Sequence, residues 1–354
     1  MKAFDIVRSV LLMSLVATQI LADDRPPRPI PSGIDTRDRF LELIERPHVP
    51  LNQFERPSVI VDGIVETGFE FDAEANQRVP GLLVKKNDKT SESTRRPAVI
   101  VLHGTGGSKD AMKLLLRKLA NSGVIAVAMD ARFSGERATF GKGSDAYRAA
   151  ILETWKTGNG YPFYYDTVWD LMRLIDYLEI RADVDPQRIA AMGISKGGTE
   201  LYLTAAVDTR ILASVSCIGV QSFDWALDHN AWQSRISTIR SAVDYAAEEL
   251  NVTNVDSLFI RRFYQRVVPG IEKEFDGPQM LPLIAPRPLL VINGEKDDRT
   301  PVPGLELCVN AARKAYRNAN ASHNFEFWLQ PNVGHVVTLE SERNAIEWLI
   351  KKLK

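Results

Sequence analysis

In the stretch Gly193-Ile194-Ser195-Lys196-Gly197-Gly198, a serine stands between glycines. An apolar run at residues 188–192 precedes this stretch and an amphipathic run at residues 199–207 follows it. The serine therefore lies on the turn between a predicted strand and a predicted helix. Glycines on both sides remove side chains that would collide in so tight a turn. Such a turn leaves the hydroxyl of Ser195 exposed at the end of a strand, the position of a nucleophile.

Outside this turn, short apolar runs alternate with longer amphipathic runs from residue 97 to the C-terminus. Apolar runs of about five residues predict buried parallel strands, and the amphipathic runs predict helices that cover them. The expected strands are residues 98–102, 124–129, 188–192, 213–220, 288–292 and 324–329. The expected helices are residues 109–121, 164–181, 199–207, 304–318 and 340–352. The predicted fold class is α/β, with a mostly parallel central sheet flanked by helices.

Two further stretches interrupt or precede this alternation. Residues 64–71 and 78–85 resemble strands separated by a polar turn and predict an antiparallel lead-in. Residues 221–285 contain helix-like stretches with no strand between them, which predicts a helical insertion. Ligands of open α/β sheets bind at the carboxyl ends of the strands. We therefore expect the insertion to be a cap over the site, the alternative being a packing elaboration.

The composition limits the possible partners. The chain has 354 residues, of which 45% are hydrophobic and 25% charged, and a formal net charge of −1. This balance, without any long run of Lys or Arg, argues against a nucleic-acid partner and favours a small or neutral one. Two cysteines cannot supply a disulfide framework, and Cys and His residues do not recur at metal-ligand spacing in the sequence. Neither a metal nor another cofactor is expected, and the oligomeric state is left open.

The N-terminus has the parts of a secretory signal. Lys2 and Arg8 precede an apolar run at residues 10–22, and a polar, proline-containing segment follows. We expect a signal peptide at residues 1–22 and a secreted or periplasmic protein, the alternative being a buried N-terminal helix. The run is too short to span a membrane, so stable membrane insertion is not expected. Residues 23–57 predict an extended arm with one helix near residues 37–44, ahead of a domain at residues 58–354.

A base and an acid on strand-end loops are expected to complete a catalytic arrangement with Ser195. A serine hydroxyl needs a base, and His335 follows the last predicted strand, whereas His103 is expected to hold its own loop. The acid that orients the base is expected in the loop at residues 293–301, where Asp297 and Asp298 are both candidates.

Two backbone N–H groups are expected to bind the oxyanion of the intermediate. Lys196 follows the nucleophile and supplies one of them. The second comes from the glycine-rich loop at residues 103–107, where we prefer Thr105 to Gly104 or Gly106.

These motifs together resemble the α/β-hydrolase superfamily, and within it the dienelactone hydrolase and acetyl xylan esterase branches. The loops at residues 103–107, 193–198 and 294–301 and the pair Gly334-His335 carry the resemblance, which covers residues 78–354. The chain order Ser, Asp, His is that of the superfamily. Because Gly-x-x-Asp is the usual spacing of the acid loop in these esterases, the resemblance favours Asp297. Lys196 departs from the pattern, since Gln or Met is common there.

The resemblance implies a secreted serine carboxylester hydrolase that acts through an acyl-enzyme. Export and the esterase resemblance favour an acetylated or otherwise esterified carbohydrate as the substrate. The aromatic stretch at residues 161–165 is either packing or a lining for such a sugar. Two alternatives stay open: a serine peptidase similar to the prolyl oligopeptidases, and a non-catalytic binding protein with a hydrolase fold.

Overall fold

The computed structural model describes residues 35–87, 95–141 and 143–354. The predicted signal peptide at residues 1–22 lies outside the described residues, as does the first part of the predicted arm, residues 23–34.

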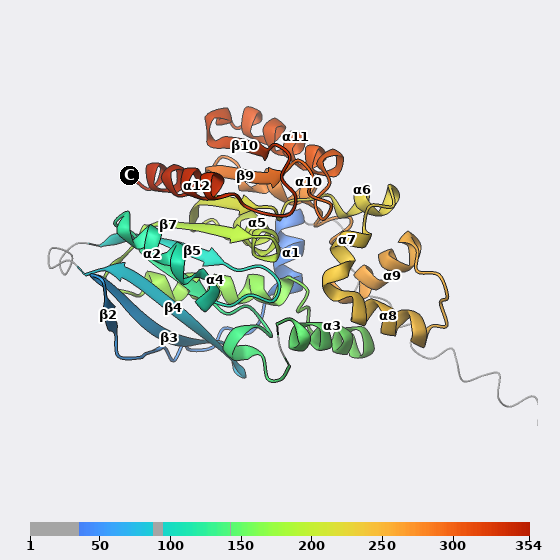
Figure 1. Ribbon diagram of the computed structural model, residues 1–354, viewed down its shortest axis with the longest axis horizontal. Helices are drawn as coiled ribbons and strands as arrows, with labels where there is room; N and C mark the ends of the chain where they lie inside the picture. The colour runs from blue at the N-terminus through green and yellow to red at the C-terminus, as the bar shows by residue number, and fades with distance from the viewer. Residues whose placement is uncertain (1–34, 88–94, 142) are drawn as a thin grey trace, which may run out of the picture. The chain divides into compact units, whose positions relative to one another are not determined.

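The described residues form one ten-stranded sheet in the order β1-β3-β4-β6-β5-β7-β8-β9-β10, with β2 paired to β3 (Figure 1). The strands are β1 Phe54–Glu55, β2 Val59–Val61, β3 Ile64–Glu74, β4 Gln77–Lys86, β5 Arg96–Leu102, β6 Ile125–Met129, β7 Val184–Ile194, β8 Ile211–Cys217, β9 Leu289–Gly294 and β10 Phe325–Gln330. Strands β5 to β10 pair in parallel, and the pairs of β1, β2, β3 and β4 are antiparallel. The predicted α/β class, with a mostly parallel sheet and an antiparallel lead-in, is confirmed.

Helices cover both faces of this sheet. Helices α2 and α12 contact it on one face, where Leu116 and Leu349 share a buried cluster with Val99 and Met192. Helices α4 and α5 contact β7 on the other face. All the residues of α5 are buried, because this helix lies between the sheet and α1, α4 and the insertion. The helices outside the insertion are α1 Thr36–Ile44, α2 Lys113–Asn121, α3 Asp145–Thr157, α4 Tyr165–Glu179, α5 Lys196–Val207, α11 Val302–Asn318 and α12 Leu339–Lys352.

The insertion between β8 and β9 is helical. Its α-helices are α6 Phe223–Asp228, α7 Gln233–Ile236, α8 Arg240–Glu249, α9 Ser257–Val267 and α10 Gly277–Met280. Helices α8 and α9 contact α3, a helix that is absent from those expected from the sequence (Figure 1). The apolar residues Tyr147, Ile151 and Trp155 recur every four positions in α3 and are buried. That spacing is the signal that could have predicted this helix.

The described part of the predicted arm is attached to the domain. Helix α1 forms near the predicted position, and its fully buried Phe40 contacts Tyr165 and Phe275 with ring centroids 5.0 Å apart in each pair. Strand β1 pairs with β3, so the sheet begins before residue 58, where the prediction placed the start of the domain. A two-residue strand has too little periodicity to be recognised from sequence.

Candidate active site

Ser195 lies on a strained turn between β7 and α5. Its backbone φ is +56°, a value that non-glycine residues rarely adopt. The turn is tight enough that a Cβ added to Gly193 would lie 2.1 Å from the carbonyl oxygen of Gly197, and one added to Gly197 would lie 2.6 Å from that of Leu102. The N–H of Ser195 donates to the carbonyl of Cys217 at 2.8 Å, which ties the turn to the end of β8.

His335 meets Ser195 from the loop between β10 and α12. Its Nε2 lies 2.7 Å from the Oγ of Ser195, and its Nδ1 lies 2.8 Å from the Oδ2 of Asp297. A proton on Nδ1 would donate to the carboxylate and leave Nε2 free to accept the hydroxyl proton of Ser195. This tautomer is the one that suits a general base.

Asp297 is buried in the loop after β9, with 2% of its surface exposed. Its carboxylate accepts hydrogen bonds from the N–H of Arg299 at 2.9 Å and from the hydroxyl of Thr300 at 2.7 Å. Burial by itself raises the pKa of Asp297, but its contacts with His335, Thr300 and the Arg299 N–H outweigh burial and lower this pKa. Asp298 is exposed, so the structure brings Asp297 and not Asp298 to His335. Sequence reasoning missed Thr300, whose role depends on the folded shape of the loop.

The residues predicted to carry the oxyanion donors lie close to Ser195 in the chain or in space. Lys196 is the first residue of α5, where backbone N–H groups have no acceptor within the helix. A Cβ added to Gly104 would lie 3.4 Å from the Cβ and 4.0 Å from the Oγ of Ser195, so the loop that carries Thr105 runs alongside the nucleophile.

The side chain of Lys196 is buried next to Ser195. It forms an ion pair with Glu200 one helical turn away, and its Nζ lies 5.2 Å from the ring centroid of Tyr147 on α3. Burial raises the pKa of Glu200, although the charge of Lys196 opposes this rise. The residue that departs from the esterase pattern thus contacts α3 instead of facing solvent.

His103 holds the loop on which Thr105 lies. Its Nε2 accepts a hydrogen bond from the N–H of Ala131 at 3.2 Å, and its Nδ1 lies 2.8 Å from the carbonyl of Gly104. Burial lowers the pKa of His103 to about 4. The ring is therefore neutral at neutral pH, and its neutral Nε2 supplies the acceptor that Ala131 needs.

This buried imidazole should make folding stability depend on pH. Between its unfolded pKa of about 6.5 and its folded pKa of about 4, the folded state binds fewer protons, so stability is lost as the pH falls through this window. Relative to a His103→Gln variant, we expect the wild-type free energy of unfolding to decrease by about 2 kcal/mol between pH 7 and pH 5. Urea unfolding at both pH values measures this difference, with the exposed His229→Gln as the control. Parallel pH dependence of the wild-type protein and His103→Gln would contradict the prediction.

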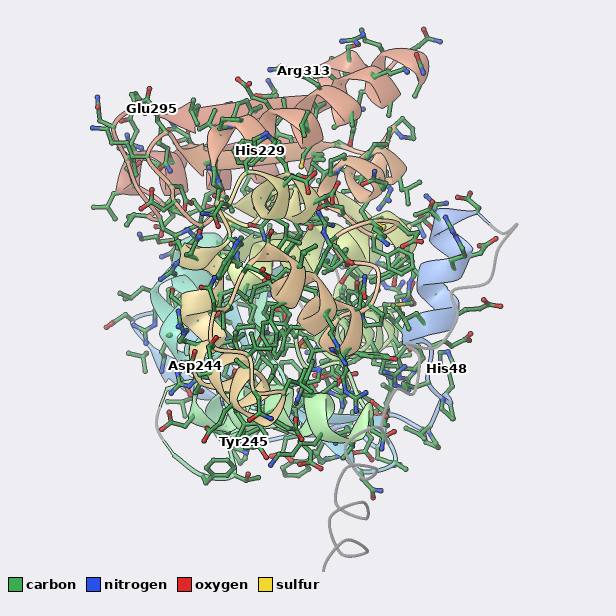
Figure 2. The ribbon with its side chains drawn as sticks, turned by 90° about the vertical axis from the view of Figure 1, so that its right-hand side faces the viewer. His48, His229, Asp244, Tyr245, Glu295 and Arg313 are labelled. Carbon is green, nitrogen blue, oxygen red and sulfur yellow. The ribbon has the colours of Figure 1, made fainter. Side chains whose placement is uncertain are left out.

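Two other histidines and the aromatic stretch have different surroundings. His229 is exposed and stacks on Trp225, and His48 lies across the view of Figure 2 from Glu295 of the acid loop. The rings at residues 161–165 are at most 8% exposed, and Phe163 contacts Tyr164 with ring centroids 4.3 Å apart. These rings therefore pack against one another and against their neighbours in the structure.

A cavity lies between the insertion and the acid loop. Its volume is about 440 Å³, and it is lined by Ala231, Gln233 and Ser234 of the insertion and by residues 295–298 and 301–303. Such a volume suits a small ligand. Among residues 35–87, 95–141 and 143–354, no group of three His, Cys, Asp or Glu side chains is placed to hold a metal ion. No helix in the same part of the chain is long and apolar enough to span a membrane.

The sheet order, the strained serine turn and the contact of a strand-end histidine with that serine define an α/β-hydrolase. A family model described as glucuronyl esterase of fungi matches residues 84–320. The match covers more than half of the chain, so this protein belongs to the glucuronyl esterase family and is a hydrolase that acts on ester bonds.

Individual proteins are also similar to this chain. A Bacillus subtilis (strain 168) protein named as a hydrolase, YtaP, is 27% identical over 305 residues, which cover 82% of this chain and 89% of YtaP. The structure of acetyl xylan esterase 1 from Thermoanaerobacterium sp. has a TM-score of 0.64 and 17% identity, covering 90% of this chain and 93% of that one. The glucuronoyl esterase from Solibacter usitatus has a TM-score of 0.60 and 15% identity, covering 90% and 91%. The two structures show the shared fold, and the predicted resemblance to α/β-hydrolase esterases is confirmed.

Proposed function

We propose that this protein is a serine carboxylester hydrolase in which Ser195, His335 and Asp297 act as a catalytic triad. The observation that carries the proposal is the continuous hydrogen-bonded series from Ser195 Oγ through the His335 ring to the buried Asp297 carboxylate. A serine hydroxyl becomes a useful nucleophile only when such a base removes its proton.

The reaction has two steps. The Oγ of Ser195 adds to the ester carbonyl carbon while its proton passes to Nε2 of His335. The N–H groups of Thr105 and Lys196 would bind the oxyanion, and the alcohol leaves with the proton from His335. Water then attacks the acyl-enzyme, giving its proton to His335, and the carboxylic acid is released as Ser195 regains its hydrogen.

We propose an ester of a carbohydrate as the substrate, with a uronic acid as its acyl part. The glucuronyl esterase match supports the uronic acid, and the acetyl xylan esterase fold supports a carbohydrate ester more generally. We also propose that residues 1–22 are a signal peptide that exports the enzyme, because Lys2 and Arg8 precede an apolar run at residues 10–22. The helical insertion at residues 221–285 is proposed to be a cap, because it borders a cavity that also touches Asp297.

A substrate panel tests this proposal. Benzyl glucuronate, acetylated xylan, a feruloyl sugar ester and p-nitrophenyl acetate are compared at equal enzyme concentration, and we expect the highest kcat/KM for benzyl glucuronate. A higher value for acetylated xylan or the feruloyl ester would overturn the uronic acid assignment but keep the esterase. Absence of hydrolysis of all four esters would overturn the proposed function.

A further inference from the structure

The insertion is hydrogen-bonded to the loop that carries the proposed catalytic acid. Arg235 lies on α7 and is 4% exposed. Its Nη2 donates to the backbone carbonyl of Arg299 at 3.3 Å, and its Nε donates to the Gln221 side-chain oxygen, also at 3.3 Å. Gln221 is itself buried at the start of the insertion.

The carbonyl of Arg299 accepts hydrogen bonds from both Arg235 and Gln221 when the oxygen and nitrogen of the Gln221 amide are placed to suit their neighbours. When the Gln221 amide is turned by 180°, its oxygen still accepts from Arg235 Nε, now at 3.2 Å, and its nitrogen donates to the Arg299 carbonyl at 2.6 Å. One carbonyl oxygen has two lone pairs and can accept both donors. Arg235 and Gln221 therefore form a clamp, which we call the Arg299 clamp, between the insertion and the acid loop.

Arg235 also interacts with Tyr164. Burial raises the pKa of the Tyr164 phenol, and its interactions with Arg235 and with Thr199, which lies one turn after Ser195 on α5, oppose this rise. Tyr164 has a backbone φ of +89°, a strained value that persists only where the surrounding structure enforces it. Because Arg235 also donates to Gln221, it cannot follow a movement of the acid loop without breaking a buried hydrogen bond.

From the clamp, hydrogen bonds continue to the nucleophile. The residue whose carbonyl is clamped, Arg299, donates its N–H to Oδ1 of Asp297 at 2.9 Å. Asp297 Oδ2 lies 2.8 Å from His335 Nδ1, and His335 Nε2 lies 2.7 Å from Ser195 Oγ. The clamped residue is therefore the same residue that orients the carboxylate.

We infer that Arg235 is a positioning residue of the active site, through which the insertion sets the orientation of Asp297. The inference rests on the proposed function of the triad. It assigns the insertion a role besides covering the site: the acid loop has its productive shape only when α7 is docked. Displacement of a reacting group by about 1 Å can cost about 100-fold in rate, so small shifts of this loop matter.

The test compares Arg235→Met with Arg235→Lys and with Arg261→Met. Arg261 is the matched control because it lies in the same insertion and pairs with Asp224 and Asp228, which also belong to the insertion. For Arg235→Met we expect kcat to fall about 10- to 100-fold with KM nearly unchanged. Arg235→Lys should recover part of this loss because an ammonium still reaches one acceptor. Arg261→Met should keep the wild-type kcat.

A spectroscopic readout separates positioning from general loosening. The Nδ1 proton of His335, hydrogen-bonded to Asp297, should give a low-field proton signal in the resting wild-type protein. This signal should weaken or shift in Arg235→Met and stay unchanged in Arg261→Met. If Arg235→Met does not fold, Arg235→Lys and Gln221→Ala report on the same clamp, with smaller changes of the same kind.

Two outcomes would overturn the inference. One is a wild-type kcat and an unchanged low-field signal in Arg235→Met. If that variant does not fold, the same result in both Arg235→Lys and Gln221→Ala counts instead. The other is an equal change in Arg261→Met, which would mean that any loosening of the insertion has this effect. The low-field signal is recorded without substrate, so it tests the clamp independently of hydrolysis. If the wild-type protein hydrolyses no ester but Arg235→Met still alters the signal, the proposed function is wrong and the clamp stands.

Discussion

Replacing Ser195 with alanine is expected to lower kcat for ester hydrolysis about 10⁴- to 10⁶-fold. Alanine keeps the Cβ, so the backbone at φ +56° is no more strained than before. The change removes only the oxygen that His335 contacts at 2.7 Å. Without this oxygen no acyl-enzyme can form, and the remaining rate comes from substrate binding and oxyanion contacts. Turnover of benzyl glucuronate and p-nitrophenyl acetate measures the effect.

A second serine controls for the substitution itself. Ser237 is exposed in the insertion, where its hydroxyl donates to the carbonyl of Ser234. Ser237→Ala should keep the wild-type rate, and both variants should unfold at the wild-type temperature. If Ser195→Ala retains the wild-type rate on every ester, the acyl-enzyme mechanism is wrong.

Replacing Asp297 with asparagine is expected to lower kcat about 10⁴-fold with the fold intact. The N–H of Arg299 donates to Oδ1, so the amide oxygen of the new side chain should occupy that position. The amide nitrogen then faces His335 Nδ1 in place of Oδ2. It donates to Nδ1, which moves the imidazole proton to Nε2 and leaves no acceptor for the hydroxyl of Ser195. Steady-state kinetics at the optimal pH measures the loss.

The neighbouring residue is the matched control for this change. Asp298 has the same charge and is exposed one position along the same loop, so Asp298→Asn should change kcat by less than about twofold. Equal losses in both variants would indicate a general electrostatic effect of the loop. A loss confined to Asp298→Asn would transfer the role of the acid to Asp298.

The serine turn and the layered fold were predictable because their causes are local. The glycines on both sides of Ser195 permit one kind of tight turn, and buried parallel strands require short apolar runs such as residues 98–102. The strand-end position of His335 follows from the same alternation. Helix α3 was missed although its apolar residues have helical spacing, because the surrounding loops carry no strand that would mark its limits.

The choice between Asp297 and Asp298 shows where sequence reasoning ends. Both carboxylates follow the same strand, and spacing alone favours neither; the resemblance to known esterases suggested Asp297. The structure buries Asp297 against His335 and leaves Asp298 exposed, because the loop folds back so that Thr300 donates to the Asp297 carboxylate. That arrangement depends on contacts between residues that only the folded loop brings together.

Local sequence is therefore enough for the strained turn at Ser195, since steric exclusion acts between neighbouring residues. The surroundings of that turn depend on distant parts of the chain: His335 lies 140 positions from Ser195, and Arg235 is 64 positions from the Arg299 carbonyl that it holds. Hydrogen bonds are short-ranged and directional, so their partners exist only after the sheet and the insertion have packed. Tertiary structure alone decided how the Asp297 carboxylate is oriented and which residues of the insertion contact the Arg299 carbonyl.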